Sequence, residues 1–393
     1  MTALATGRRL SHLVIVVALI GGLLITAGPA RLSSLVLARP IEPPAAPLPP
    51  EGESAGVVRF SFIAYGDTRS KVDGQALQPD HGDLVDRIQD YVKAHASSAF
   101  PVRFVLQSGD AVTRGSEAEQ WTVSFSPLIG RLTHDAGLPY FFAVGNHDEP
   151  AASQARGLGL GNVLSAMSRL IPAEGSPRRL PGYATYAFGF GSLFAVAIDS
   201  NIAADMTQLD WVTDQLEHLD RHRYRHVLLF FHHPLFSSGP HGGSTRGPSS
   251  QTMTEDSVEP QTAALRRLYA PLFRRYHVRL TLSGHDHLLD HFIERYKDGG
   301  QSYRRDDIVS GGGGAPIYTY RGEPELTAYL LAGANQSVQV SHVMRPGATA
   351  TENPHHVLIV RVDGDRLHLE VLGQGPEDYR PFNGRSELEL TDP

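Results

Sequence analysis

Short apolar runs that each stop at a polar residue place the strongest constraint on how this chain can fold. The runs at 57–64, 102–107 and 139–144 are followed by Asp67, Asp110 and the pair Asn146-His147. Helical patterns fill residues 83–95 and 117–132 between them. This alternation predicts parallel strands with helical crossovers. Loops at the carboxyl ends of such strands meet at one edge of the sheet, where open α/β folds bind ligands.

The second half of the chain repeats this arrangement with different polar residues. Three more apolar runs, at 193–198, 226–231 and 279–282, end at Asp199, at His232-His233 and at His285-Asp286-His287. Helices are expected at 206–219 and 261–276. Four glycines at 311–314 allow close approach of the backbone, although a flexible turn is an alternative. Residues 357–372 read as a hairpin around Asp363-Gly364 that closes a sheet edge.

The N-terminus is predicted to target or anchor the chain. Residues 13–28 carry no charge and follow Arg8 and Arg9, so residues 1–30 read as a signal or a membrane anchor, with cleavage and retention both open. The arginines predict that the rest of the chain crosses the membrane, either secreted or tethered outside the cytoplasm. Paired arginines also leave a folded-export signal as an alternative. Residues 31–56 are expected to form a proline-rich, extended linker, and residues 57–393 the working domain with its C-terminal hairpin.

Composition narrows the kinds of site that the chain can form. It has no cysteine, so any metal must be held by His, Asp, Glu or Asn. Lysine and arginine number 35 against 42 acidic residues, and the net charge of −7 argues against a nucleic-acid partner. The 19 histidines therefore become the most informative residues.

Each strand-end motif is weak alone, but their order is specific. It reads Gly-Asp, Gly-Asp, Gly-Asn-His-Asp, His-x-Pro and Gly-His-x-His. In this order the chain resembles the calcineurin-like metallophosphoesterase family over about residues 58–320, and in part its purple acid phosphatase branch. The resemblance implies a four-layer α/β/β/α sandwich, with two mixed sheets flanked by helices.

The resemblance also implies a dinuclear metal site. Two cations close together need a shared anion to screen their repulsion, and by its place in the motif order Asp110 is that bridge. Asp67 and His287 are then expected to bind one ion, and Asn146, His232 and His285 the other, with a bridging hydroxide that attacks phosphorus. Such nitrogen and oxygen ligands suit zinc, manganese or iron.

Two histidines outside the metal-ligand set are predicted to act on substrate. His147, which is not a metal ligand in the family, would protonate the leaving oxygen. His241 lies nine residues after His232, as does a substrate-contacting histidine of purple acid phosphatases, within a glycine-rich loop at 237–246 that could close over substrate. A solvated loop histidine is the alternative for His241.

Two positions depart from the family pattern. Arg69 stands where many members have a metal-binding histidine, and Thr113 stands where purple acid phosphatases have a tyrosine ligand. The first metal is therefore expected to be one protein ligand short. Arg69 could instead bind the substrate phosphate through its fork of N–H groups, or it could form a salt bridge with a nearby carboxylate.

The function predicted from these residues is hydrolysis of a small-molecule phosphate ester, monoester or diester, outside the cytoplasm. The alternative is a membrane-tethered protein that binds metal or phosphate but has lost turnover through its incomplete first site. The sequence predicts no particular oligomeric state.

Overall fold

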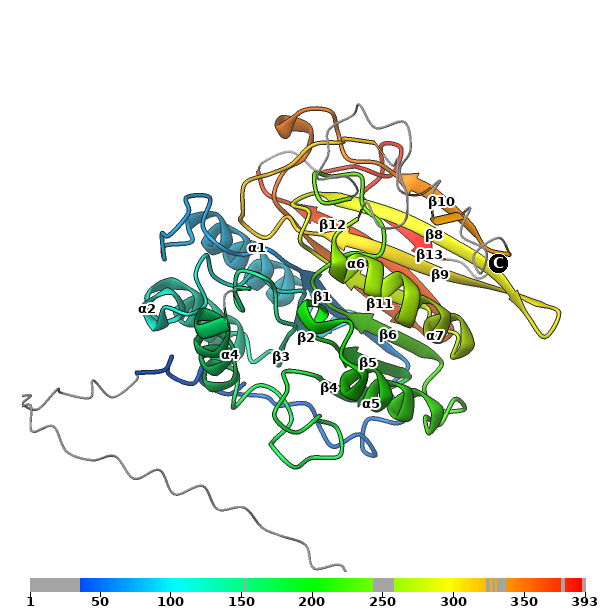
Figure 1. Ribbon diagram of the computed structural model, residues 1–393, viewed down its shortest axis with the longest axis horizontal. Helices are drawn as coiled ribbons and strands as arrows, with labels where there is room; N and C mark the ends of the chain where they lie inside the picture. The colour runs from blue at the N-terminus through cyan, green and yellow to red at the C-terminus, as the bar shows by residue number, and fades with distance from the viewer. Residues whose placement is uncertain are drawn as a thin grey trace, which may run out of the picture. The chain divides into compact units, whose positions relative to one another are not determined.

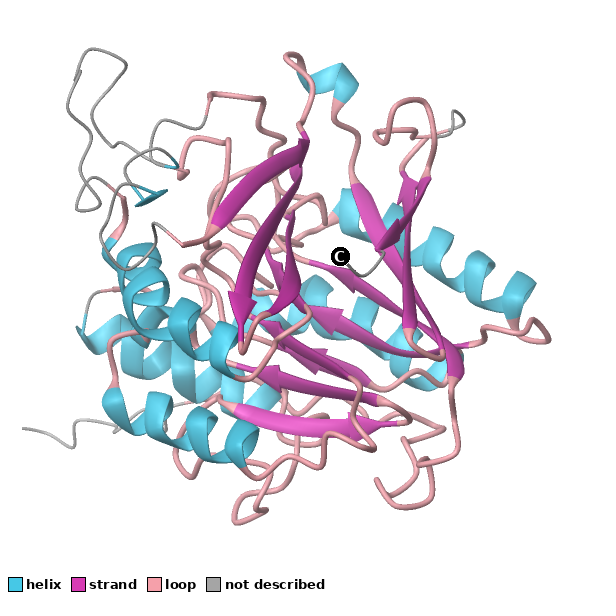
Figure 2. Ribbon diagram, turned by 90° about the vertical axis from the view of Figure 1, so that its right-hand side faces the viewer, coloured by secondary structure: helices cyan, strands magenta, loops and turns pink. Residues whose placement is uncertain are grey.

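Two mixed β-sheets lie face to face with helices on their outer sides (Figures 1 and 2). This arrangement is seen in a computed structural model that describes residues 36–151, 153–242, 258–322, 326, 329–330, 337–375 and 379–390. The predicted sandwich of two mixed sheets flanked by helices is confirmed.

The first sheet has six strands. Their order is β13 (Glu387–Leu390), β12 (Arg366–Gly373), β11 (His356–Asp363), β1 (Arg59–Tyr65), β2 (Val102–Gln107) and β3 (Tyr140–Phe142). Strands β1, β2 and β3 run parallel, and the other neighbours pair antiparallel. The parallel half carries the first two aspartates and the Asn-His pair at its carboxyl ends.

The second sheet has seven strands. Their order is β10 (Gln339–Met344), β8 (Leu289–Asp298), β9 (Gln301–Ser310), β7 (Leu280–Ser283), β6 (His226–Phe230), β5 (Leu193–Ala197) and β4 (Tyr186–Phe190). Strands β5, β6, β7 and β9 are parallel to their neighbours in that set. Strands β4, β8 and β10 pair antiparallel.

Helices cover the outer faces of both sheets. On the first sheet these are α1 (Pro79–His95), a helical run from α2 (Ala118–Gln120) through α3 (Ser126–Gly130) to Asp135, and α4 (Ser153–Ala166). On the second they are α5 (Met206–Glu217), α6 (Pro260–Ala264) and α7 (Ala270–Arg275), the last two joined by a wider turn at Leu265–Tyr269. Short 3₁₀ turns lie at Ser200–Ile202 and Ala350–Glu352.

Strand β6 shows how the sequence builds the layers. Its alternate residues Leu228 and Phe230 belong to the core between the sheets, whereas Val227 and Leu229 belong to the core beneath the outer helices. Because successive strand side chains point to opposite faces, a wholly apolar strand must be covered on both. Aromatic rings join the sheets across the inner core, as where Phe104 meets Phe188 with ring centroids 5.4 Å apart.

Most predicted elements that border the site form within one or two residues of their expected ends. The hairpin of β11 and β12 also forms, but it does not close the sheet as predicted. Strand β11 pairs with β1, and the free side of β12 is covered by β13. This edge strand, Glu387–Leu390, has only four residues that alternate between glutamate and leucine, so the sequence alone does not identify it as a strand.

The described part of the proline-rich segment packs on the domain rather than standing free of it. The compact unit begins at Leu37. Ala38 and Ile41 are buried, and the Ile41 amide donates to the Ala166 carbonyl at 2.8 Å. At Ala38 and Ile41 the segment is therefore held against the end of α4, unlike the free-standing spacer that its proline content predicts.

The N-terminal targeting segment, residues 1–30, lies outside the described residues and stays a prediction. In the part of the chain that the structure describes, we find no helix with the length and apolar character needed to span a bilayer.

Candidate metal centre

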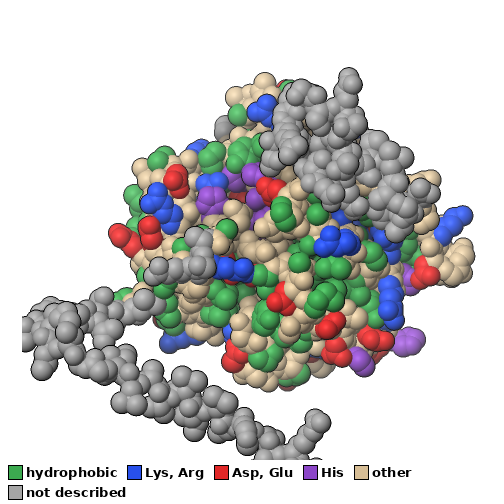
Figure 3. All heavy atoms as spheres, viewed as in Figure 1, with side chains coloured by type: hydrophobic (Ala, Val, Ile, Leu, Met, Phe, Trp, Pro, Cys, Tyr) green, Lys and Arg blue, Asp and Glu red, His purple; other side chains and the backbone are tan. Residues whose placement is uncertain are grey.

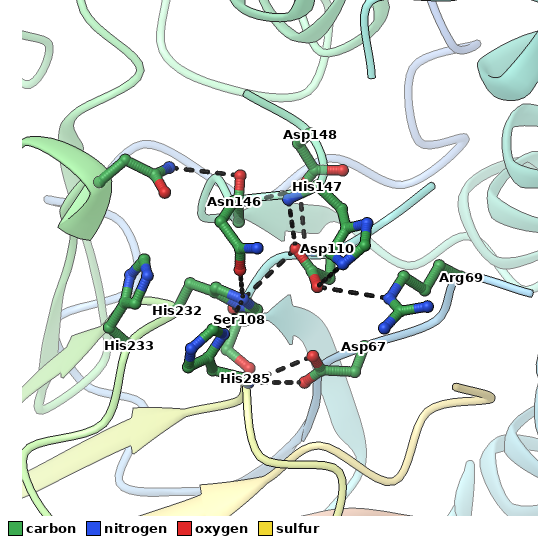
Figure 4. A network of polar contacts seen from close by, with 12 residues as sticks. Asp67, Arg69, Ser108, Asp110, Asn146, His147, Asp148, His232, His233 and His285 are labelled. Atoms are coloured by element: carbon green, nitrogen blue, oxygen red, sulfur yellow. Dashed lines mark hydrogen bonds and ion pairs between the residues drawn. The ribbon is translucent and has the colours of Figure 1, made fainter. Parts of the chain in front are cut away.

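The six predicted metal ligands come together where parallel strands of both sheets end. Figure 4 shows all of them except His287. Asp67, Asp110 and Asn146 follow β1, β2 and β3. His232 follows β6, and His285 and His287 follow β7. The His285 amide donates to the Asp67 carboxylate at 3.0 Å, so the edges of the two sheets are in direct contact.

Three of these residues have a backbone conformation that is rare for side chains other than glycine. The φ angles of Asp67, Asp110 and His285 are 60°, 55° and 71°. Left-handed residues of this kind cost about 1–3 kcal/mol each and persist where the surroundings hold them. Here each one turns the chain sharply at a strand end and aims a ligand into the shared space.

A glycine-rich turn supports the first of these loops, as expected from its sequence. The Gly313 amide donates to the Gly66 carbonyl at 2.9 Å. A Cβ atom on Gly313 would lie 2.2 Å from that oxygen, which only glycine avoids. The Ala315 amide also donates to the Asp67 carbonyl at 2.9 Å, so the turn holds two successive carbonyls directly before Thr68.

The carboxylate of Asp148 ties two ligand loops together. Its Oδ2 accepts from the amides of Asp110 at 2.8 Å and Gly145 at 2.9 Å, and its Oδ1 accepts from the Ala111 amide at 2.9 Å. The side chain is fully buried. Asp148 therefore fixes the loop after β2 and the loop after β3 relative to each other.

We expect Asp148→Asn to lower the free energy of unfolding by about 2–4 kcal/mol. The new NH₂ group would face backbone N–H donors, because both carboxylate oxygens now accept from them. Urea unfolding followed by circular dichroism measures the change, with Asp135→Asn at an exposed carboxylate as the matched control. A loss below about 0.5 kcal/mol, equal to that of the control, would contradict this role.

Hydrogen bonds fix the proton positions of His232 and His285. His232 Nδ1 lies 2.9 Å from the Ser108 carbonyl oxygen, so it must donate there and leave Nε2 as an acceptor. His285 Nε2 lies 2.8 Å from Glu259 Oε2, which leaves Nδ1 as an acceptor. These two acceptor nitrogens face each other at 3.1 Å. Two such lone pairs repel, and a cation between them would turn the repulsion into binding.

Two oxygen ligands converge on the same nitrogen. Asn146 Oδ1 lies 2.9 Å and Asp110 Oδ1 lies 3.3 Å from His232 Nε2. Burial lowers the pKa of His232 to about 3, so its ring is neutral at pH 7 and its lone pair is available. Asn146, His232, His285 and Asp110 thus fit one metal ion with mixed nitrogen and oxygen ligands.

A second group fits another ion on the far side of Asp110. One ligand atom from each of Asp67, Asp110 and His287 lies within 4.8 Å of the others. His287 Nδ1 donates to the Pro316 carbonyl at 2.6 Å, so its Nε2 acceptor faces Asp67 Oδ1 at 3.5 Å. Burial and repulsion from Asp110 raise the pKa of Asp67 well above its ordinary value, and a cation between the two carboxylates would remove that repulsion. Asp110 is the residue common to both groups.

At the two departures from the family pattern, neither side chain is placed as a further ligand for the group of Asp67, Asp110 and His287. Thr113 Oγ1 donates to Gln120 Oε1 at 2.8 Å and is thus engaged away from the site. Arg69 Nε lies 3.5 Å from Asp110 Oδ2 and hydrogen-bonds to no described residue, although the side chain is only 10% exposed. Arg69 therefore brings a positive charge, not a ligand, to this side of Asp110.

The two predicted catalytic histidines lie on either side of the ligands. The His147 amide donates to Asp110 Oδ1 at 2.9 Å, and its Nδ1 donates to the Thr113 carbonyl at 2.9 Å. Its Nε2 is 4.0 Å from Asp110 Oδ2, and the side chain is 30% exposed. The ring of His241 lies 4.1 Å from that of His285.

Burial lowers the pKa of His241, but the hydrogen bond to Glu259 and the negative charges of Asp286, Glu259 and Asp110 together raise this pKa above its ordinary value. The structure thus brings all nine predicted site residues together, and their roles stay predictions. In the predicted loop at 237–246, residues 243–246 lie outside the described residues.

Histidine side chains are visible on one face of the molecule, beside acidic and basic ones (Figure 3). Of the predicted site residues, the side chains of His147 and His241 are about one third exposed, at 30% and 32%, so both reach solvent.

Sequence reasoning missed two residues at the site. Glu259 stands between His241 and His285 and, with His233 and His285, forms a further group of three potential ligand atoms within 4.8 Å. It lies outside every strand-end motif, so the sequence carries no signal for it. Tyr318 stacks on His287 with ring centroids 4.1 Å apart, and only its nearness to the glycine-rich turn could have pointed to it.

Comparison with known proteins places this arrangement in context. A family model described as calcineurin-like phosphoesterase matches residues 62–289. No curated protein matches the sequence. Among solved structures, the purple acid phosphatase PPD1 of yellow lupin (Lupinus luteus) aligns with a TM-score of 0.54 and 16% identity over 85% of this chain. The alignment covers 54% of the lupin chain, so this protein spans about half its length.

Two other structures align less closely. PhoD aligns with a TM-score of 0.49 and 10% identity, covering 88% of this chain and 74% of its own. GAP50 of Plasmodium aligns with a TM-score of 0.45 and 13% identity, covering 86% of this chain and 90% of its own. At these identities the likeness to the lupin enzyme concerns the fold alone, and the other two carry no further argument.

Proposed function

The chain belongs to the calcineurin-like phosphoesterase family, and from this membership and the geometry of the site we propose that it hydrolyses phosphate esters with two bound metal ions. One observation carries the proposal: the acceptor nitrogens of His232 and His285 face each other at 3.1 Å beside Asp110. A cation between the two nitrogens would use both lone pairs and remove their repulsion.

Asp110 would contact both ions. Asp67 and His287 would complete the coordination of one ion, and Asn146, His232 and His285 that of the other. Metal ions bound there would supply positive charge for a phosphate group and would lower the pKa of a bound water toward neutrality. The protein as a whole is acidic, with a net charge of −7, and the ions and Arg69 would supply positive charge at the site. Zinc, manganese and iron all suit these ligands.

Three side chains of the protein would act on the substrate itself. His147 Nε2 faces the site beside Asp110 and would donate a proton to the leaving oxygen. The Arg69 guanidinium, without another hydrogen-bond partner at Nε, would bind phosphate oxygens. His241 would do the same from the opposite side, held by Glu259. Because a monoester phosphate offers more free oxygens to these donors than a diester, we favour monoesters.

A direct test compares two small-molecule substrates. We expect the purified protein to hydrolyse para-nitrophenyl phosphate when manganese or zinc is added, and to lose this activity when a chelator removes the metal. Hydrolysis of bis-para-nitrophenyl phosphate should be slower. Inactivity toward both substrates with two metals bound per chain would contradict the proposal. Inactivity with a single metal bound would favour the alternative of a tethered binding protein without turnover.

We also propose that the domain works outside the cytoplasm, secreted or tethered by its N-terminal segment. The support is the uncharged run at residues 13–28 behind Arg8 and Arg9. Protease protection of the expressed full chain in sealed cells, before and after permeabilisation, tests the location. A chain that is digested only after permeabilisation would contradict it.

A further inference from the structure

Glu259 occupies a bridging position between a metal-site residue and a substrate-side residue. Its Oε1 lies 2.9 Å from His241 Nδ1 and its Oε2 lies 2.8 Å from His285 Nε2. An ionised carboxylate can only accept hydrogen bonds, so both ring nitrogens must donate to it. The proton positions of both histidines are therefore fixed by one side chain.

The consequence for His285 concerns metal binding. With the proton held on Nε2, its Nδ1 keeps the lone pair that faces His232 Nε2 at 3.1 Å. Without the carboxylate the proton could move to Nδ1, and the nitrogen that should bind the metal would be blocked. Carboxylates that accept the second N–H of a ligating histidine orient the ring and strengthen its binding to the metal.

The consequence for His241 concerns orientation. Its backbone amide donates to Asp286 Oδ1 at 3.1 Å, and its ring lies 4.1 Å from the ring of His285. With Nδ1 bound to Glu259, the ring is held at this distance and its Nε2 is left for another partner. His241 is thus not a freely moving loop histidine.

The anchoring of Glu259 makes it suitable for this task. It directly precedes α6, and its carbonyl accepts from the Ala263 amide at 2.9 Å. The side chain is 22% exposed, so its two hydrogen bonds are largely shielded from competing water. The backbone of Glu259 is therefore held at the start of α6, and this limits where its carboxylate can lie.

We propose that Glu259 is a positioning residue that couples the metal site at His232 and His285 to the substrate-side residue His241. This inference rests on the proposed metal-dependent function and extends it to one residue outside the family motifs. It assigns Glu259 no contact with the reacting atoms.

The test measures metal affinity directly, by calorimetric titration of the chelator-treated full chain with zinc or manganese. We expect Glu259→Ala to weaken one of two binding events about 10- to 100-fold and to change the other less than about twofold. Glu259→Gln keeps one acceptor oxygen and should lie between Ala and the wild type. Asp298→Asn is the matched control, because Asp298 pairs with His277 at 2.9 Å away from the site and should change neither event.

A second readout separates positioning from a purely structural role. At saturating metal, Glu259→Gln and His241→Ala should each raise KM about tenfold, and the double variant should be no worse than the poorer single variant. Additive effects, or unchanged affinity at both metal sites in Glu259→Ala, would overturn the inference. If the alanine variant does not fold, unchanged affinities in Glu259→Gln would overturn it instead.

The two proposals can fail separately. A wild-type chain that binds two metals without hydrolysing either nitrophenyl substrate contradicts the proposed function, yet the affinity measurement still decides the role of Glu259. A wild-type chain that hydrolyses substrate, with Glu259→Ala binding both metals normally, keeps the function and overturns this inference.

Discussion

Asp110→Asn is expected to lower phosphate-ester hydrolysis by about a thousandfold or more and to weaken the binding of both metal ions. Among the described residues, Asp110 is common to both ligand groups, through Oδ1 toward His232 and as a member of the group with Asp67 and His287. Asparagine keeps an oxygen for the His147 amide, so the loop should survive. What it removes is the negative charge that screens two cations from each other.

The measurement for this variant combines turnover of para-nitrophenyl phosphate with metal content after gel filtration. Asp73→Asn, at an exposed carboxylate paired with Arg114, serves as the control and should leave both quantities unchanged. An Asp110→Asn protein with two tightly bound metals and the full rate would show that this carboxylate does not bridge.

His147→Ala should have the second-largest effect and a different signature. We expect kcat to fall about 10²- to 10⁴-fold while metal content stays at the wild-type value. The backbone amide of His147, which donates to Asp110, is untouched by the substitution. Only the ring is lost, and with it Nε2, which lies beside Asp110 with access to solvent.

The leaving group reveals whether that ring donates a proton. A para-nitrophenolate departs readily without a proton, whereas an alkoxide does not. The fall in kcat of His147→Ala should therefore be larger for an alkyl phosphate. His134→Ala, at an exposed histidine on the helical run before β3, is the control. Equal losses for both kinds of ester would argue against proton donation by His147.

The meeting of the six predicted ligands could be expected from the sequence because each stands at a strand end, whereas their roles come from the family resemblance. Short apolar strands followed by Gly-Asp or Gly-His-x-His leave little freedom in where the chain turns, and parallel strands bring their ends to one edge. Asp67 and Asp110 illustrate this, since both occupy left-handed turns directly after buried strands. The order of the motifs along the chain then indicated the family.

Other features depend on contacts between distant segments and carry no local signal. Glu259 reaches His241 and His285 only because α6 begins beside β7 in space. The contact of Ile41 with the end of α4 depends on residues far away in the chain, which the linker sequence does not reveal. The edge strand β13 has four residues and an alternating polar pattern, which is too short for periodicity to detect.

The central claim is that two metal ions share Asp110, and anomalous diffraction from crystals grown with zinc or manganese tests it most directly. The account predicts two anomalous peaks on either side of the Asp110 carboxylate. One peak should be bound by Asp67 and His287, the other by Asn146, His232 and His285. A single peak, or peaks that do not contact Asp110, would contradict it.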